Sequence, residues 1–255
     1  MIDTIKAVLE NTQNRTPMVH SITNNVTIND CANIILAAGG TAIMAQDERE
    51  VEEITSHAQA LVINMGAVRA QEAMLRAAKI AKRNGRPVVL DPVAAGASTL
   101  RREMCSRLLS ENLVSVIRGN ASEVRALAAG AEQETGVEAS ALDSVTEDNL
   151  QESAAWLRSF SRRTGAVVML TGAMDVITDG TRTAVVRGGS AYLRRITGAG
   201  CMLSVLCGAF AAVEPDALAS ARHAATFWKS CATAAAAQCR GSASFRVALL
   251  DEASM

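Results

Sequence analysis

The stretch Thr197-Gly198-Ala199-Gly200-Cys201 runs directly into the small-residue segment Met202–Leu206 and is the most informative part of the chain. Small residues at a turn expose backbone amides at the start of a helix, where they have no intrahelical partner and the helix dipole adds positive charge. Such a position suits an anion, most often a phosphate. The closing Cys201 could handle a proton beside that anion. The same pattern is also typical of close helix–sheet packing around an inert buried cysteine.

Around this turn, short β-branched runs alternate with longer helical patterns. The predicted strands are Met18–Ile22, Thr41–Ala45, Leu61–Met65, Pro87–Leu90, Leu113–Ile117 and Val167–Thr171. The predicted helices are Ala70–Arg83, Leu100–Leu109, Ala121–Ala129, Asp148–Arg163 and the alanine-rich Asp216–Gln238. Asp175–Thr178 and Ala184–Val186 are typical of an edge hairpin. This alternation predicts an α/β fold, with a mostly parallel central sheet covered by helices on both faces.

No linker, repeat or low-complexity tract divides the chain, so residues 1–255 are expected to form a single domain. The charged, aperiodic stretch Ala131–Asn149 is interpreted as a surface loop or an irregular entry to a helix rather than a boundary.

The composition excludes several classes of protein. The net charge is −1 and only 3% of residues are aromatic, which argues against a nucleic-acid binder. Met1–Arg15 lacks a signal-peptide core, and the apolar runs Cys31–Ala45 and Cys201–Val213 are too short to span a membrane. The six cysteines contain no CxxC pair, so no structural zinc is expected. We therefore expect a cytoplasmic protein with reduced thiols.

Polar residues follow three of the predicted strands. Asp91 ends the run Val88–Leu90, Arg118–Glu123 follows Val116-Ile117, and Thr171-Gly172 follows another apolar run. Ligands of an open parallel sheet gather beyond the carboxyl ends of its strands. These strand ends and the glycine turn could therefore converge on one crevice.

Each of these residues also has a structural interpretation. Asn120 with Glu123 forms a capping-box pattern, yet the carboxylate could also hold Mg²⁺ directly or through water. Asp91 before proline could be only a strand-ending turn, but a carboxylate directly after a buried strand is costly unless it faces a site. Arg118 could be a surface charge or a polyphosphate ligand.

The N-terminal segment is less specific. A lone His20 is expected to be a hydrogen-bonded structural residue. The polar cluster Thr23–Asn25 could line a pocket for a small neutral ligand, and spacing alone places Met44 in the core.

Taken together, the motifs resemble the hydroxyethylthiazole kinase family of the ribokinase-like superfamily. The matching segments are His20–Val26, Ala42–Ala45, Val88–Val93, Ile117–Glu123, Leu170–Gly172, Ile196–Ser204 and Phe245–Asp251. They follow the family's order over nearly the whole chain. The most specific part is the combination of Arg118–Glu123 with a glycine turn ending in Cys201, because most ribokinase-like relatives carry Asp at that position.

The resemblance implies a ribokinase-like three-layer sandwich that phosphorylates the hydroxyl of 4-methyl-5-(2-hydroxyethyl)thiazole with ATP and Mg²⁺. It also implies a homotrimer with active sites at subunit interfaces. The matching positions are Arg118 and Thr171 for ATP, extended here to Asn120 and Gly172; Met44, Gly198 and Asn25 for the thiazole; and Asp91 and Glu123 for Mg²⁺.

Cys201 stands where the superfamily places its catalytic base. The amides of Gly198, Ala199 and Gly200 would hold the transferring phosphoryl group, while Cys201 accepts the alcohol proton or only orients the hydroxyl. The helix terminus is expected to favour the thiolate, whereas nearby phosphates oppose it.

Two segments depart from the family pattern, residues 188–192 and 241–244, and they bear on the shape of the pocket and the preferred alcohol. Three other functions remain open. A kinase for a pyrimidine alcohol or sugar is disfavoured by Cys201 and Ser21–Asn25. A dehydratase of hydrated nicotinamide cofactors relies, in relatives, on an Asp in the glycine turn. A non-catalytic binding protein would leave Asp91 and Glu123 unexplained.

Overall fold

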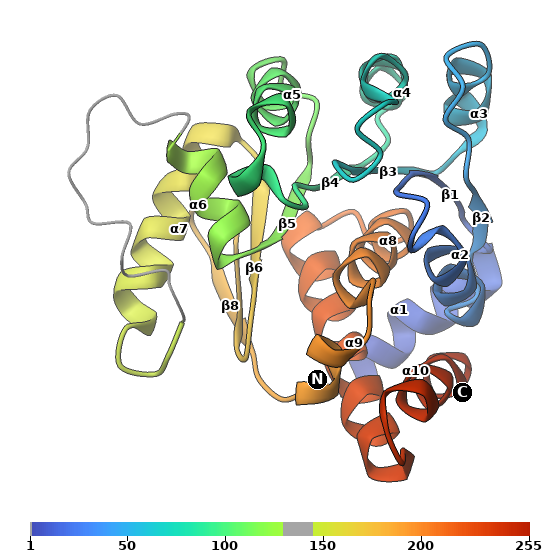
Figure 1. The fold of residues 1–255 in the computed structure, drawn as a ribbon, viewed down its shortest axis with the longest axis vertical. Helices are drawn as coiled ribbons and strands as arrows, with labels where there is room; N and C mark the ends of the chain where they lie inside the picture. Colours follow the sequence, from blue (N-terminus) through green and yellow to red (C-terminus); the bar gives the residue numbers. More distant parts are fainter. Residues whose placement is uncertain (1, 130–144) are drawn as a thin grey trace.

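The strands of the chain form one mixed sheet in the computed structural model, which describes residues 2–129 and 145–255 (Figure 1). The strands are β1 Met18–Ile22, β2 Thr41–Ile43, β3 Ala60–Asn64, β4 Val88–Asp91, β5 Val116–Asn120, β6 Val167–Thr171, β7 Asp175–Thr178 and β8 Thr183–Val186. Their order is β2-β1-β3-β4-β5-β6-β7-β8. The pairs from β2 to β6 are parallel, and β7 and β8 add an antiparallel hairpin. The predicted α/β class and edge hairpin are confirmed.

Helices cover both faces of this sheet (Figure 1). One face carries α3 Val51–His57, α4 Gln71–Arg83, α5 Thr99–Ser110, α6 Ala121–Ala129 and α7 Leu150–Thr164. The other carries α1 Ile2–Arg15, α2 Ile28–Ala37, α8 Ala199–Ala211, α9 Ala217–Gln238 and α10 Ser242–Ser254. Two short 3₁₀ turns, η1 Ala95–Ala97 and η3 Ala191–Arg195, lie in the connections. The three-layer prediction is thus confirmed.

The central strands are apolar on both sides because both faces are covered. In β3, Leu61 and Ile63 enter the core under α4, whereas Val62 enters the core under α8. This continuous apolar pattern is typical of a parallel sheet between two helical layers. Polar side chains are consequently placed where the strands end, and the site is built there.

Several predicted boundaries were shifted. β5 begins at Val116 rather than Leu113 and continues to Asn120, which pairs with Thr171 of β6. Arg118 therefore lies inside a strand, not after one. β2 ends at Ile43 instead of Ala45, and residues 131–144 of the predicted Ala131–Asn149 loop lie outside the described residues.

α8 approaches the sheet closely and brings the glycine turn to its strand ends. A Cβ placed on Gly208 would lie 2.6 Å from Cγ2 of Val62, so only glycine permits this approach. α8 packs against β1, β3 and β4. Among the helices of the described residues, none is long and apolar enough to cross a membrane.

Candidate active site

A buried polar cluster joins the ends of β3 and β4 to the first turns of α8. Asn64 and Asp91 are the last residues of the two strands and lie opposite each other in the parallel register. The Asn64 Nδ2 donates to Oδ2 of Asp91 at 2.9 Å and to Sγ of Cys201 at 3.2 Å. One amide group thus connects the carboxylate to the thiol.

A second amide points at the same sulfur. Asn24 Nδ2 donates to Oδ1 of Asn64 at 3.2 Å and lies 3.5 Å from Sγ of Cys201. Its own Oδ1 accepts the backbone N–H groups of Val26 and Thr27 at 3.1 Å. These backbone donors fix which end of the Asn24 amide is oxygen, and Asp91 does the same for Asn64. Both amides therefore present N–H groups to the Cys201 sulfur.

Asp91 is buried, with 1% of its surface exposed. Ser204 Oγ donates to Oδ2 of Asp91 at 2.8 Å, and Nη1 of Arg118 lies 3.9 Å away. Ser204 reaches the carboxylate because it lies three residues after Cys201 on the same face of α8. Burial raises the pKa of Asp91 and the charge of Glu123 adds to this, whereas Arg118 opposes it. The Asp-Pro turn therefore places a buried carboxylate within the cluster.

The thiol of Cys201 is also buried, and its environment contradicts the expected stabilisation of the thiolate. Burial raises the Cys201 pKa, and the charge of Asp91 raises it further. Arg118 and the hydrogen bond from Asn64 act in the opposite direction but are weaker. The helix terminus is outweighed because taking the sulfur out of water penalises its charged form. The resting side chain is a thiol whose sulfur accepts two amide hydrogen bonds.

The capping interpretation of Asn120 and Glu123 is confirmed. Asn120 Oδ1 accepts the Glu123 N–H at 3.0 Å, and Oε2 of Glu123 accepts the Asn120 N–H at 2.8 Å. The other oxygen of Glu123 accepts the Ala94 N–H at 3.3 Å. The cap holds this carboxylate at the end of β5, close enough for its charge to raise the pKa of Asp91.

These two carboxylates fit a magnesium ion. Mg²⁺ is usually held by one or two carboxylates and keeps several waters. Asp91 and Glu123 repel each other, and a cation between or beside them would relieve that repulsion. Among the described residues there is no group of three or more His, Cys, Asp or Glu side chains suited to a metal. The donor set therefore fits sparse, water-mediated ligation rather than a protein cage.

Next to the cluster lies a cavity of about 590 Å³, where the predicted strand ends and the glycine turn meet. Arg118, Asn120, Thr171, Gly172, Ala199 and Gly200 are among its lining residues. Two of the three predicted strand ends, at Arg118–Asn120 and Thr171-Gly172, thus meet the glycine turn at one crevice, whereas Asp91 does not line the cavity and lies in the neighbouring buried cluster.

Arg118 is held in this cavity by its neighbours. Its Nη2 donates to Oγ1 of Thr171 at 2.8 Å, and that hydroxyl donates to the Gly119 carbonyl at 3.2 Å. A Cβ placed on Gly200 would lie 2.4 Å from Nη1 of Arg118. The guanidinium therefore lies directly against the glycine turn. A polyphosphate at this position could accept hydrogen bonds from both the guanidinium and the helix amides.

The turn itself requires glycine at its first position. Gly198 has φ +80°, and a Cβ there would lie 2.7 Å from Cγ2 of Thr27. α8 starts at Ala199, and its first two residues, Ala199 and Gly200, line the cavity, at the helix end whose amides have no intrahelical partner.

The residues predicted to contact the thiazole lie on the β1–β2 side of the site. Met44 follows β2, is half-buried and packs partly on the core beneath α8, and Asn25 is exposed in the turn before α2. The structure brings Asn24, not Asn25, to Cys201. His20 is structural as predicted: its ring nitrogens lie 2.9 Å from Thr55 Oγ1 and 2.9 Å from the Ala45 carbonyl.

Four polar residues of the site escaped the sequence analysis. They are Asn64, Ser204, Asp175 and Lys229. Asn64 ends its strand as Asp91 does, and Ser204 lies on the same helix face as Cys201, so the rules that selected Asp91 and Cys201 would also have selected them. Lys229 pairs with Asp175, 54 positions earlier in the sequence, and no local pattern signals that contact.

Known proteins with similar sequences share one description. The sequence model of the hydroxyethylthiazole kinase family matches residues 9–255. The hydroxyethylthiazole kinase of Clostridium acetobutylicum is 46% identical over 214 residues, which cover 83% of this chain and 78% of the relative. The hydroxyethylthiazole kinase of Desulforudis audaxviator is 44% identical over 237 residues, which cover 92% of this chain and 84% of the relative.

Solved structures agree. The hydroxyethylthiazole kinase structure from Pyrococcus horikoshii OT3 has a TM-score of 0.86 at 34% identity and covers 99% of this chain and 93% of its own. An ADP complex of Bacillus subtilis pyridoxal kinase, with a TM-score of 0.60 at 19% identity, covers 86% of this chain and 92% of its own and shares the fold alone. With its glycine turn, strand-end carboxylate and thiol all in place, this chain belongs to the hydroxyethylthiazole kinase family.

Proposed function

We propose that this chain transfers the γ-phosphoryl group of ATP to the hydroxyl of 4-methyl-5-(2-hydroxyethyl)thiazole, with Mg²⁺, as a step of thiamine salvage. One observation carries the proposal: the amide-rich start of α8 lies between a cavity lined by Arg118 and a buried cluster that contains Asp91 and Cys201. Phosphoryl transfer needs positioning and charge stabilisation more than covalent help from the protein, and this arrangement offers both.

ATP would occupy the cavity. Arg118 and Thr171 would bind its phosphates, with Asn120 and Gly172 lining the path. The amides of Gly198, Ala199 and Gly200 would receive the transferring group, because negative charge on its equatorial oxygens is favoured at a helix N-terminus. Asp91 and Glu123 would hold Mg²⁺, mainly through water, and the ion would supply neutralisation of phosphate charge.

The alcohol would lie on the Cys201 side of the turn, with Met44, Gly198 and Asn25 around the thiazole ring. Since the resting thiol is protonated, Cys201 would first orient the hydroxyl and could take its proton only as the new bond to phosphorus forms. A loose transition state releases the alcohol proton late, so a strong base is unnecessary. Burial of Cys201 and the two amides from Asn24 and Asn64 keep that sulfur fixed.

The family resemblance also supports a homotrimer in the cytoplasm with active sites at subunit interfaces. The thiazole side lies near the free edge of β2, and Val26 beside it is 75% exposed. A neighbouring subunit would cover both. Sedimentation velocity of the purified protein, with and without ligands, tests the trimer.

The decisive experiment follows product mass after incubation of the purified protein with ATP and hydroxyethylthiazole, with and without Mg²⁺. Thiazole phosphate formed only with the metal is the expected result. A folded protein that binds ATP yet makes no product would overturn the substrate assignment, and hydrated nicotinamide cofactor or other small alcohols would then be tested. Cys201→Ala with near-wild-type turnover would overturn the proton-acceptor role and leave the reaction assigned.

A further inference from the structure

Lys229 is a buried cation at the wall of the cavity, and the reaction as described makes no use of it. Its side chain comes from the middle of α9 and only 5% of the residue is exposed. Its Nζ lies 2.9 Å from the Ala173 carbonyl, 3.3 Å from the Gly172 carbonyl and 3.4 Å from the Gly188 carbonyl. Oδ1 of Asp175 lies 3.2 Å from the same nitrogen. The ammonium thus joins two separate segments of backbone, residues 172–173 and Gly188, to α9.

Asp175 completes the arrangement from the other side. The carboxylate accepts the Gly172 N–H at 3.0 Å and pairs with Lys229. The Gly172 residue is therefore held at its N–H by Asp175 and at its carbonyl by Lys229. Thr171 directly precedes it and accepts the hydrogen bond from Arg118. A continuous series of contacts runs from α9 to the guanidinium that rests on the glycine turn.

The ammonium has no capacity left for a ligand in this arrangement. It carries three N–H donors and faces four acceptors, and the Asp175 carboxylate balances its charge. We propose that Lys229 is a positioning residue for the nucleotide: its ammonium fixes the Gly172–Ala173 turn and the Gly188 loop against α9, and so sets the orientation of Thr171 and Arg118 toward the phosphates of ATP. This inference rests on the proposed function, because it assumes that the cavity takes the nucleotide.

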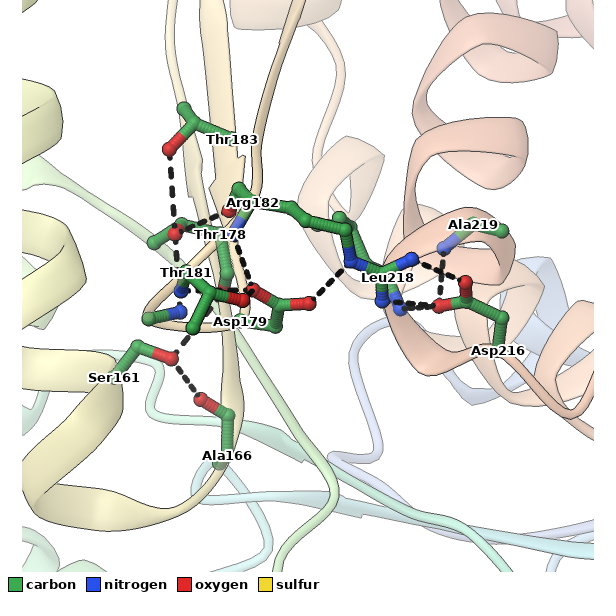
Figure 2. Close-up of polar contacts among 11 residues, drawn as sticks. Ser161, Ala166, Thr178, Asp179, Thr181, Arg182, Thr183, Asp216, Leu218 and Ala219 are labelled. Carbon is green, nitrogen blue, oxygen red and sulfur yellow. Dashed lines mark hydrogen bonds and ion pairs between the residues drawn. The ribbon is translucent and has the colours of Figure 1, made fainter.

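A second ion pair joins α9 to the same hairpin and provides a matched comparison. Figure 2 shows Arg182 between Asp179 and Asp216, with Nη1 at 2.6 Å from Oδ2 of Asp216 and Nε at 2.7 Å from Oδ2 of Asp179. Asp216 also caps α9 through the Leu218 and Ala219 N–H groups. This pair lies at the far end of the helix and its Arg182 side chain is 58% exposed, against 6% for Lys229.

The test compares Lys229→Met with Arg182→Met. We measure binding of a non-hydrolysable ATP analogue by calorimetry, together with kcat and both KM values in the thiazole assay. Lys229→Met is expected to weaken analogue binding and raise the KM for ATP by about tenfold or more, with the KM for thiazole within about twofold of wild type. Arg182→Met is expected to leave both nucleotide values unchanged.

Chemical rescue separates the charge from the packing. Lys229→Ala is assayed with added ammonium chloride, and choline chloride at the same ionic strength is the control. Ammonium should recover nucleotide affinity at least severalfold, because the three carbonyls and the carboxylate then regain a cation. Equal behaviour of the two salts would overturn the role given to the ammonium.

Two further outcomes are decisive. If Lys229→Met does not fold because Asp175 is left as an unpaired buried charge, the double variant Lys229→Met with Asp175→Asn removes that charge and is tested in the same way. A loss of thermal stability with unchanged analogue binding would overturn the inference. Wild-type protein that binds the analogue but leaves the thiazole unphosphorylated would instead refute the proposed substrate, and the binding comparison would still decide the role of Lys229.

Discussion

Two neighbouring regions of the site are built in opposite ways. In the thiol–carboxylate cluster, formed by Asn24, Asn64, Asp91, Cys201 and Ser204, the residues contact one another through their side chains. In the cavity wall, formed by residues 171–173, 188–189 and 199–200, the contacts are made mostly by backbone that small residues leave open. The cluster depends on the identity of its side chains, whereas the wall depends on small residues that leave its backbone accessible.

α8 serves both regions because its first turn has two differently used faces. Cys201 and Ser204 point into the cluster, one helical turn apart. Ala199 and Gly200 line the cavity. Substitutions in the cluster should therefore change the chemical step, and substitutions in the wall should change nucleotide affinity.

The largest effect is expected from Asp91→Asn in the cluster. The change removes the negative charge that faces Arg118 and the proposed metal, so kcat should fall by about 100-fold or more. The free energy of unfolding at neutral pH should not fall by more than about 1 kcal/mol, because the amide oxygen of Asn can take the place of Oδ2 as the acceptor for Ser204 and Asn64, and the change removes a buried charge. Steady-state kinetics and urea unfolding measure the two quantities. Parallel losses of activity and stability would show that Asp91 is only structural.

A smaller and different effect is expected from Gly200→Ala in the wall. The new Cβ would overlap Nη1 of Arg118, so the guanidinium would have to shift and its Nη2 would lose the hydrogen bond to Thr171. The KM for ATP should rise by about tenfold, which corresponds to the binding free energy typically lost with a hydrogen bond to a charged group. The KM for thiazole should change little.

Gly241→Ala is the matched control, since Gly241 is not among the residues that line the cavity, a Cβ there meets nothing within 4 Å, and its φ of 178° is extended backbone. If Gly200→Ala lowered kcat and left ATP affinity intact, the division between cluster and wall would be wrong.

Asn64→Ala sharpens the comparison inside the cluster. The substitution removes the N–H groups that Asn64 donates to Cys201 and to Asp91. Asn64 is not part of the cavity wall. We expect kcat to fall by about tenfold, a loss of about 1–3 kcal/mol in unfolding free energy, and an unchanged KM for ATP. Asn33→Ala, at an exposed asparagine that bonds only within α2, should change none of these values. A raised KM for ATP in Asn64→Ala would show that the two regions are coupled.

The smallest effect concerns a buried residue outside both regions. Burial lowers the pKa of His20 below its ordinary value of 6.5. When the pH falls below the ordinary pKa of histidine, the unfolded chain binds more protons than the folded protein. The free energy of unfolding is therefore highest above that pH and decreases as the pH falls below it, by at most about 1.4 kcal/mol per pH unit. Urea unfolding at about pH 7.5 and about pH 5.5 should show the loss in wild type and a smaller loss in His20→Gln. An equal pH dependence in the two proteins would assign it to other groups.

The sequence by itself determined the architecture and much of the site. Alternation of apolar strands with helical patterns was sufficient for a parallel sheet between two helical layers, because both signals are local and repeat along the chain. Asp91 and Arg118 were found because parallel strands end at the same edge of a sheet, and the Gly198–Cys201 turn because its small residues leave backbone amides open at the start of a helix. The Asn120–Glu123 cap was found because it spans only four residues.

Only the tertiary structure decided how these residues are used. Asn64 connects Asp91 to Cys201 through a register between two strands, and Lys229 meets Asp175 from a helix far along the chain. Burial also reversed the expected effect on the Cys201 thiol, since the desolvation of a charge depends on everything packed around it. Local patterns select which side chains reach the site; the distances between segments and the exclusion of water, which fix the charge and partners of those side chains, exist only after the chain has folded.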